Sequence, residues 1–280
     1  MSKLKIAIAV ILVLTVIAAL HFLQRQKRSL SDKFEKALTQ QSTNSGELEG
    51  KSTIPIETST VTYSNSTKGF FAKPKDKGNY PGVVMIHEWW GLNDNIKEMA
   101  KNLSGQGYMV LAVDLFNDKV AKTPTEATAL ISSLNQNIAT DNLKSAVIFL
   151  KNHGATKTAS LGWCFGGGQS LELSLSGVKL DATVIYYGNL QSDKNKLAKI
   201  NWPVLGIFGD KDQTIPVKSV KDFENSLESL DIVKEIYIYP GVGHAFANPS
   251  NPNFAPDETK DAWDKTLVFL EKSLKQDKKI

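Results

Sequence analysis

The cysteine at position 164 lies in a setting that favours nucleophilic chemistry. It is the centre of the segment GWCFG, between a predicted strand and a predicted helix. In this pattern a sharp strand-to-helix turn exposes the central side chain, and the flanking glycines leave room for neighbouring backbone. The N-terminus of the helix favours a thiolate at Cys164, and the N–H of Phe165 would face a developing oxyanion. The structural alternative is a small buried cysteine in a glycine-rich turn.

A histidine and two aspartates follow Cys164 in the order nucleophile, acid, histidine. His244 lies in the segment GHAF, and Asp210 and Asp212 lie in the segment GDKDQTIP. Each segment follows a predicted strand, and loops at the carboxyl ends of strands build the sites of α/β sheets. Both aspartates are candidates for orienting the histidine, and the spacing to the following Ile-Pro pair favours Asp212. Taken singly, a turn or a surface-loop histidine explains each segment.

A glutamate leaves another buried predicted strand in the segment HEWWG. Glu88 beside a thiol would accept its proton or hold it in one rotamer, and Trp89 could supply a second oxyanion N–H. The two tryptophans are as consistent with packing in a lid or core as with contact to a substrate. Position 91 is Gly, which excludes an H-E-x-x-H zinc site, and four His with one Cys exclude a Cys-rich zinc site. We therefore expect neither a metal nor a cofactor.

Strand and helix patterns alternate from about residue 54 onward. This alternation predicts a mainly parallel sheet with helices on both faces. The predicted strands are 57–63, 69–73, 82–87, 108–115, 158–161, 182–187, 204–208 and 235–239. The predicted helices are 93–106, 124–134, 139–152, 166–176, 217–230 and 258–274.

The first 28 residues predict a transmembrane or signal helix. An apolar stretch at 6–23, broken only by Thr15 and His21, is near the minimum length that crosses a bilayer. No clean cleavage site follows it, which favours a retained anchor over a secreted protein. The basic residues on both sides do not orient the span. We expect an extracytoplasmic domain because a lone N-terminal span before a folded domain usually serves export. Residues 29–54 predict a stalk helix and a polar linker, and residues 55–280 predict the folded domain.

Composition limits the class of partner. The chain has 280 residues, of which 41% are apolar, so it can bury a sizeable core. Its net charge is +4, but five basic residues and no acidic residue fall within residues 1–28. The remaining body carries 28 basic and 29 acidic side chains. This near-neutral balance argues against a nucleic-acid partner.

The motifs together resemble the dienelactone hydrolase family, a branch of the α/β-hydrolases. The matching segments are HEWWGLN, GYMVLAVDLF, GWCFGGG, GDKDQTIP and GHAF. The resemblance implies an α/β-hydrolase fold with Cys164 as nucleophile. It also implies His244 as general base and then acid, with Asp212 as its orienter. Glu88 would be the partner of the resting thiol, displaced when substrate binds.

The same resemblance assigns the oxyanion donors and exposes two departures. The backbone N–H groups of Trp89 and Phe165 would stabilise the oxyanion. Two arginines of the best-studied members, which bind a substrate carboxylate, have no counterpart here. Asn117 and Asp118 stand at one position and Asn248 at the other. An anionic dienelactone therefore loses a charge-assisted anchor.

The expected function is hydrolysis of a small ester, lactone or thioester through an acyl-enzyme, without a cofactor. A membrane-side thioesterase is the nearest alternative, because an anchor would place the domain near acylated lipids or proteins. A cysteine peptidase and a non-catalytic binding module on the same fold are further alternatives. The sequence makes no prediction of oligomeric state.

Overall fold

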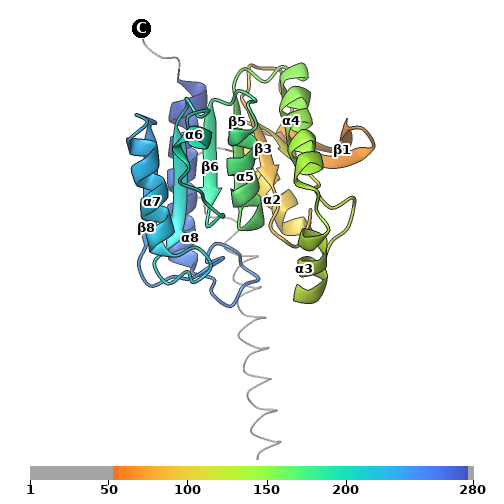
Figure 1. Cartoon of the computed structure of the whole chain (residues 1–280). Helices are drawn as coiled ribbons and strands as arrows, with labels where there is room; N and C mark the ends of the chain where they lie inside the picture. The colour runs from red at the N-terminus through yellow and green to blue at the C-terminus, as the bar shows by residue number, and fades with distance from the viewer. Residues whose placement is uncertain (1–52, 277–280) are drawn as a thin grey trace, which may run out of the picture. The chain divides into compact units, whose positions relative to one another are not determined.

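A mixed eight-stranded sheet forms the centre of the computed structural model, which describes residues 53–276 (Figure 1). The strands are β1 (Ile56–Ser64), β2 (Thr67–Pro74), β3 (Gly82–Ile86), β4 (Met109–Ala112), β5 (Thr158–Trp163), β6 (Ala182–Tyr186), β7 (Val204–Gly209) and β8 (Lys234–Tyr239). Their order in the sheet is β1-β2-β4-β3-β5-β6-β7-β8. The β1–β2 and β2–β4 pairs are antiparallel, and every other neighbouring pair is parallel. The predicted mainly parallel sheet is confirmed.

Helices alternate with the parallel strands and also follow the last one, as the sequence pattern predicts. They are α2 (Asp94–Gly105), α3 (Pro124–Ser132), α4 (Gln136–Asn152), α5 (Phe165–Leu175), α6 (Lys194–Leu197), α7 (Val217–Glu228) and α8 (Pro256–Leu270), with a π-helical end at Glu271–Lys275. The short helix α6 is absent from the sequence prediction, because four residues are too few to show a helical period. The predicted strand 108–115 is too long. Its buried run continues beyond Ala112 in the loop that follows β4.

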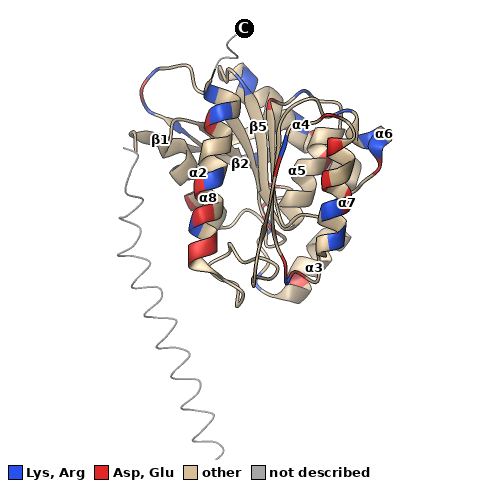
Figure 2. Cartoon of the chain, turned by 90° about the vertical axis from the view of Figure 1, so that its left-hand side faces the viewer, with Lys and Arg blue, Asp and Glu red and all other residues tan. Residues whose placement is uncertain are grey.

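The sheet separates two apolar layers. Along β3, Val84 and Ile86 pack into the layer that contains α4, α5 and α7, whereas Val83 and Met85 pack into the layer that contains α2 and α8. Figure 2 shows the sheet between these two groups of helices. Because both faces of β3 are covered, every position of the strand is apolar or glycine and buried.

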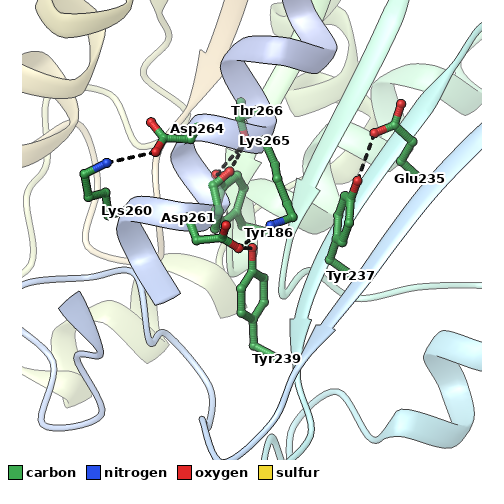
Figure 3. A network of polar contacts seen from close by, with 10 residues as sticks. Tyr186, Glu235, Tyr237, Tyr239, Lys260, Asp261, Asp264, Lys265 and Thr266 are labelled. Atoms are coloured by element: carbon green, nitrogen blue, oxygen red, sulfur yellow. Dashed lines mark hydrogen bonds and ion pairs between the residues drawn. The ribbon is translucent and has the colours of Figure 1, made fainter. Parts of the chain in front are cut away.

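Tyrosines at the ends of two strands hold α8 against the sheet (Figure 3). Tyr186 donates to the carbonyl oxygen of Ala262 at 2.9 Å, and its hydroxyl lies 2.6 Å from Thr266 Oγ1. Tyr239 donates to Asp261 Oδ2 at 2.7 Å. These contacts fix the beginning and middle of α8, and with them the end of the loop that connects β8 to α8.

The predicted anchor at 1–28 and most of the predicted stalk and linker at 29–54 lie outside the described residues. The N–H of Ile54 donates to the carbonyl oxygen of Gly105 at 2.9 Å, so the chain already contacts the end of α2 before β1 begins. Within residues 53–276, no helix combines the length and the apolar character that a membrane span requires.

Candidate active site

Cys164 lies on the turn between β5 and α5, where the sequence places it. Its backbone has φ 53° and ψ −116°, a conformation that side-chain-bearing residues rarely adopt. The N–H of Cys164 donates to the carbonyl oxygen of Tyr186 at 3.0 Å, and its own carbonyl oxygen accepts from Gly168 N–H at 3.1 Å. The turn is therefore held by bonds to β6 and within α5.

Two glycines allow close backbone contacts at this turn, one within the turn itself and one with the end of β3. A Cβ added at Gly162 would lie 2.1 Å from the carbonyl oxygen of Gly166. A Cβ added at Gly166 would lie 2.3 Å from the carbonyl oxygen of Ile86 and 2.5 Å from that of His87. Neither position has room for a side chain. The first turn of α5 consequently lies beside the segment that leaves β3.

Cys164, His244 and Asp212 form a continuous hydrogen-bonded chain. His244 Nε2 lies 3.0 Å from Cys164 Sγ, and His244 Nδ1 lies 2.8 Å from Asp212 Oδ2. Asp212 Oδ1 accepts from the N–H groups of Thr214 and Ile215 at 2.8 and 2.9 Å. Because the backbone holds one carboxylate oxygen, the other is directed at the imidazole. The structure thus brings together the three residues that the sequence predicts as nucleophile, base and orienter.

Asp210, the alternative acid, lies apart from this chain. Its Oδ1 accepts from Gly241 N–H at 2.7 Å, and its Oδ2 lies 3.4 Å from Lys211 Nζ. The carboxylate that contacts His244 is that of Asp212, which is 4% exposed. The aspartate in contact with His244 is thus the one that the spacing to the following Ile-Pro pair favours.

The environment of His244 favours its charged form. Burial alone would lower the pKa of His244, but hydrogen bonds to Asp212 and Cys164 outweigh it and raise the pKa to about 10. The imidazole is therefore protonated at neutral pH. An imidazolium 3.0 Å from Sγ is the counter-ion that a thiolate nucleophile requires.

Glu88 is buried beside Asn248 rather than paired with the thiol. Asn248 Oδ1 accepts from Ser250 N–H at 2.8 Å, which orients the amide so that Nδ2 donates to Glu88 Oε2. Cys164 Sγ is instead bonded to His244. The predicted Glu88–thiol pairing thus differs from the structure, because an amide from the loop after β8 supplies the carboxylate with a partner.

Burial also changes the titration of Glu88. Desolvation raises the pKa of this carboxyl to about 7, from an ordinary value of 4.5, although Asn248 and His244 both oppose the rise. Between these two pH values the folded chain binds a proton that the unfolded chain has released. The free energy of unfolding therefore falls as the pH rises from 4.5 to 7, because only the unfolded chain releases the proton of Glu88.

Replacing Glu88 by Gln is expected to stabilise the protein in a pH-dependent way. The glutamine stays neutral, so the gain in the free energy of unfolding should reach up to about 3 kcal/mol at pH 8 and fall below about 1 kcal/mol at pH 5. Thermal unfolding at both pH values measures this difference. As a control, Glu98→Gln removes an exposed carboxylate of α2 and should act equally at both. An equal effect of Glu88→Gln at pH 5 and pH 8 would contradict the assignment.

Two backbone N–H groups at the site have no partner in the described part of the chain. Within residues 53–276, neither the N–H of Trp89 nor that of Phe165 donates a hydrogen bond. Phe165 is the first residue of α5, where helix geometry leaves the N–H unpaired. Both groups belong to the segments that meet at Gly166. Free donors in this position are available to a developing oxyanion.

Aromatic side chains lie on the segments that carry the site, and one of them contacts His244. The rings of Trp89 and Trp90 lie 5.0 Å apart and are half-buried. The Tyr187 ring packs edge-on to His244 at 5.3 Å, and the whole residue is buried. Tyr187 is absent from the sequence-based site. Its position directly after a buried strand, at the same edge as Cys164, is the signal that would have indicated it.

A sequence comparison finds a family that matches nearly all of the described residues. The profile of the Dienelactone hydrolase family matches residues 67–274. Protein usf of Aquifex pyrophilus is 32% identical over 221 residues, covering 74% of this chain and 94% of that protein. A protein named as a carboxymethylenebutenolidase in Saccharolobus solfataricus is 28% identical, covering 72% of this chain and 93% of that protein.

Solved structures share the fold. A dienelactone hydrolase-like promiscuous phosphotriesterase from metagenomic libraries superposes with a TM-score of 0.71 at 22% identity, covering 79% of this chain and 99% of that one. A protein described as a dienelactone hydrolase from Klebsiella pneumoniae subsp. pneumoniae gives a TM-score of 0.70 at 24% identity, covering 76% and 98%. At these identities the likeness shows the α/β-hydrolase fold alone.

Proposed function

The chain belongs to the dienelactone hydrolase family and is a lactone or ester hydrolase, and we propose that it cleaves small uncharged substrates through an acyl-enzyme on Cys164. The observation that carries this proposal is the hydrogen-bonded chain from Cys164 Sγ through His244 to Asp212. A nucleophile, a base and an orienter in this arrangement form the basis of covalent acyl transfer.

In the proposed mechanism the Cys164 thiolate attacks the carbonyl carbon, and the carbonyl electron pair moves onto oxygen. The N–H groups of Trp89 and Phe165 stabilise this oxyanion. As it collapses, the carbon–oxygen bond to the leaving group breaks, and His244 Nε2 gives its proton to the departing alkoxide. His244 then takes a proton from water, which attacks the carbonyl carbon of the thioester. The carbon–sulfur bond breaks, and the acid and the Cys164 thiolate are released. Asp212 holds the imidazole in orientation throughout.

The substrate class follows from the charge around the site. The resemblance places substrate-binding arginines at positions where this chain has Asn117, Asp118 and Asn248. The Asn248 amide is bonded to Glu88, whose carboxylate is ionised above about pH 7. A substrate carboxylate would meet an amide and a buried acid instead of a cation. We therefore assign an acyl group without a negative charge.

A pair of substrates tests this assignment. The full chain is expected to hydrolyse p-nitrophenyl acetate with a higher kcat/KM than mono-p-nitrophenyl succinate, which carries a carboxylate on its acyl group. In Asn248→Arg, the ratio should shift toward the succinate ester by about tenfold, the worth of one charge-assisted contact. Asn248→Gln, which adds length without charge, is the matched control. A wild-type preference for the succinate ester would contradict the proposed substrate class.

A further inference from the structure

We infer that His87 is a positioning residue that holds the Glu88–Trp89 peptide so that the Trp89 N–H is directed at the oxyanion. The inference rests on the proposed acyl transfer, in which this N–H is one of the two donors. His87 is a buried polar side chain that takes no part in the acyl-transfer steps themselves.

The hydrogen bonds of His87 determine its protonation. Leu115 N–H donates to His87 Nε2 at 3.2 Å, so Nε2 carries the lone pair. The proton of the neutral imidazole is then on Nδ1, which donates to the carbonyl oxygen of Glu88 at 2.6 Å. His87 is fully buried, and this burial lowers its pKa, which keeps the ring neutral. The neutral form with the proton on Nδ1 is the one that satisfies both contacts.

The Glu88 carbonyl oxygen is held from two sides. Besides His87 Nδ1, it accepts from Gly91 N–H at 3.2 Å, which closes a tight turn. The peptide is trans, so its N–H points away from its carbonyl oxygen. Rotating this peptide would break both bonds and leave a buried imidazole N–H unpaired, which is costly. The direction of the Trp89 N–H is consequently fixed by groups that do not themselves touch substrate.

The segment that carries this fixed peptide lies beside the first turn of α5. The carbonyl oxygen of His87 itself lies against Gly166 in the first turn of α5, where Phe165 carries the other free N–H. The imidazole also packs on Phe116 at 4.8 Å and on Phe165 at 6.0 Å between ring centroids. These contacts fix the plane of the His87 imidazole. A fixed ring can hold the Glu88–Trp89 peptide in one orientation.

Two substitutions by amide side chains distinguish the effects of the two hydrogen bonds of the His87 imidazole. In His87→Asn, the side-chain NH₂ takes the place of Nδ1 and can still donate to the Glu88 carbonyl, but the acceptor for Leu115 is lost. In His87→Gln, the amide oxygen reaches the place of Nε2 and can still accept from Leu115, but the donor to Glu88 is lost. Each variant replaces the buried imidazole by an amide and loses one of its two hydrogen bonds. The two variants are therefore matched in polarity and in the expected loss of stability.

The test compares two reactions of the same sulfur in the full chain. Hydrolysis of p-nitrophenyl acetate passes through an oxyanion, whereas alkylation by iodoacetamide displaces iodide and forms none. His87→Gln is expected to lower kcat by about 10–100-fold with little change in KM. Its alkylation rate should stay within about twofold of wild type. His87→Asn, by restoring the donor, should recover most of the lost kcat.

The opposite outcomes overturn the inference. Equal losses of hydrolysis and alkylation in both variants, with an equal fall in Tm, would show that His87 only stabilises the fold. A kcat in His87→Gln close to wild type would show that the peptide needs no such support. Failure of the proposed function is distinguishable, because the wild-type chain would then be alkylated at Cys164 yet hydrolyse no ester, and the inference would fall with it.

Discussion

Replacing Cys164 by alanine is expected to reduce hydrolysis of p-nitrophenyl acetate by at least about 10³-fold. Without the sulfur no acyl-enzyme can form, and His244 retains only a weak ability to activate water. The release of p-nitrophenolate by the full chain, wild type beside Cys164→Ala, measures the effect. Because the change removes one partly buried atom, Tm should move by only a few degrees. A folded variant that keeps a tenth of the wild-type rate would contradict the nucleophile assignment.

Replacing Asp212 by asparagine is expected to lower kcat by about 10²–10⁴-fold. The asparagine can still accept from the backbone N–H groups of Thr214 and Ile215 through Oδ1. Its NH₂ would then face His244 Nδ1–H, two donors in contact, so the imidazole must turn or change tautomer. The same assay at saturating substrate measures the loss.

Asp210→Asn is the matched control for this substitution. Its carboxylate contacts Gly241 N–H and Lys211 and forms no hydrogen bond with His244 in the described part of the chain. We expect a kcat within about threefold of wild type, since the substitution weakens only the partly exposed ion pair between Asp210 and Lys211. If Asp210→Asn were the more damaging of the two, the orienting role would pass to Asp210 and the hydrogen-bond geometry would be misleading.

Much of this site is predictable from the chain because its residues follow recognisable strands. The strand runs before Cys164, Asp212 and His244 are apolar enough to identify, and parallel strands bring their carboxyl ends to one edge. The order of the three residues then predicts that they meet. The same reasoning identifies β3 and the segment that carries Glu88 and Trp89. It fails for β4, because residues buried in a loop are as apolar as residues buried in a strand.

The contacts that define the state of the site are not predictable in this way. Glu88 and Asn248 are 160 residues apart, and their bond depends on the conformations of two irregular loops. The two backbone bonds that direct Asp212 at His244 depend on the conformation of one turn. The role inferred for His87 depends on the tautomer, which only the positions of Leu115 N–H and the Glu88 carbonyl define. Sequence patterns indicate which positions are buried and with what period, but not which buried side chains contact one another.

We expect Cys164 to carry the acyl group during turnover. Intact-mass analysis of the full chain, acid-quenched during the first turnovers of p-nitrophenyl acetate, tests it most directly. The mass of the wild-type chain should increase by one acetyl group. Peptide analysis should map this group to Cys164, and Cys164→Ala should show no increase. Steady hydrolysis with no adduct, or with the acetyl group on another residue, would contradict it.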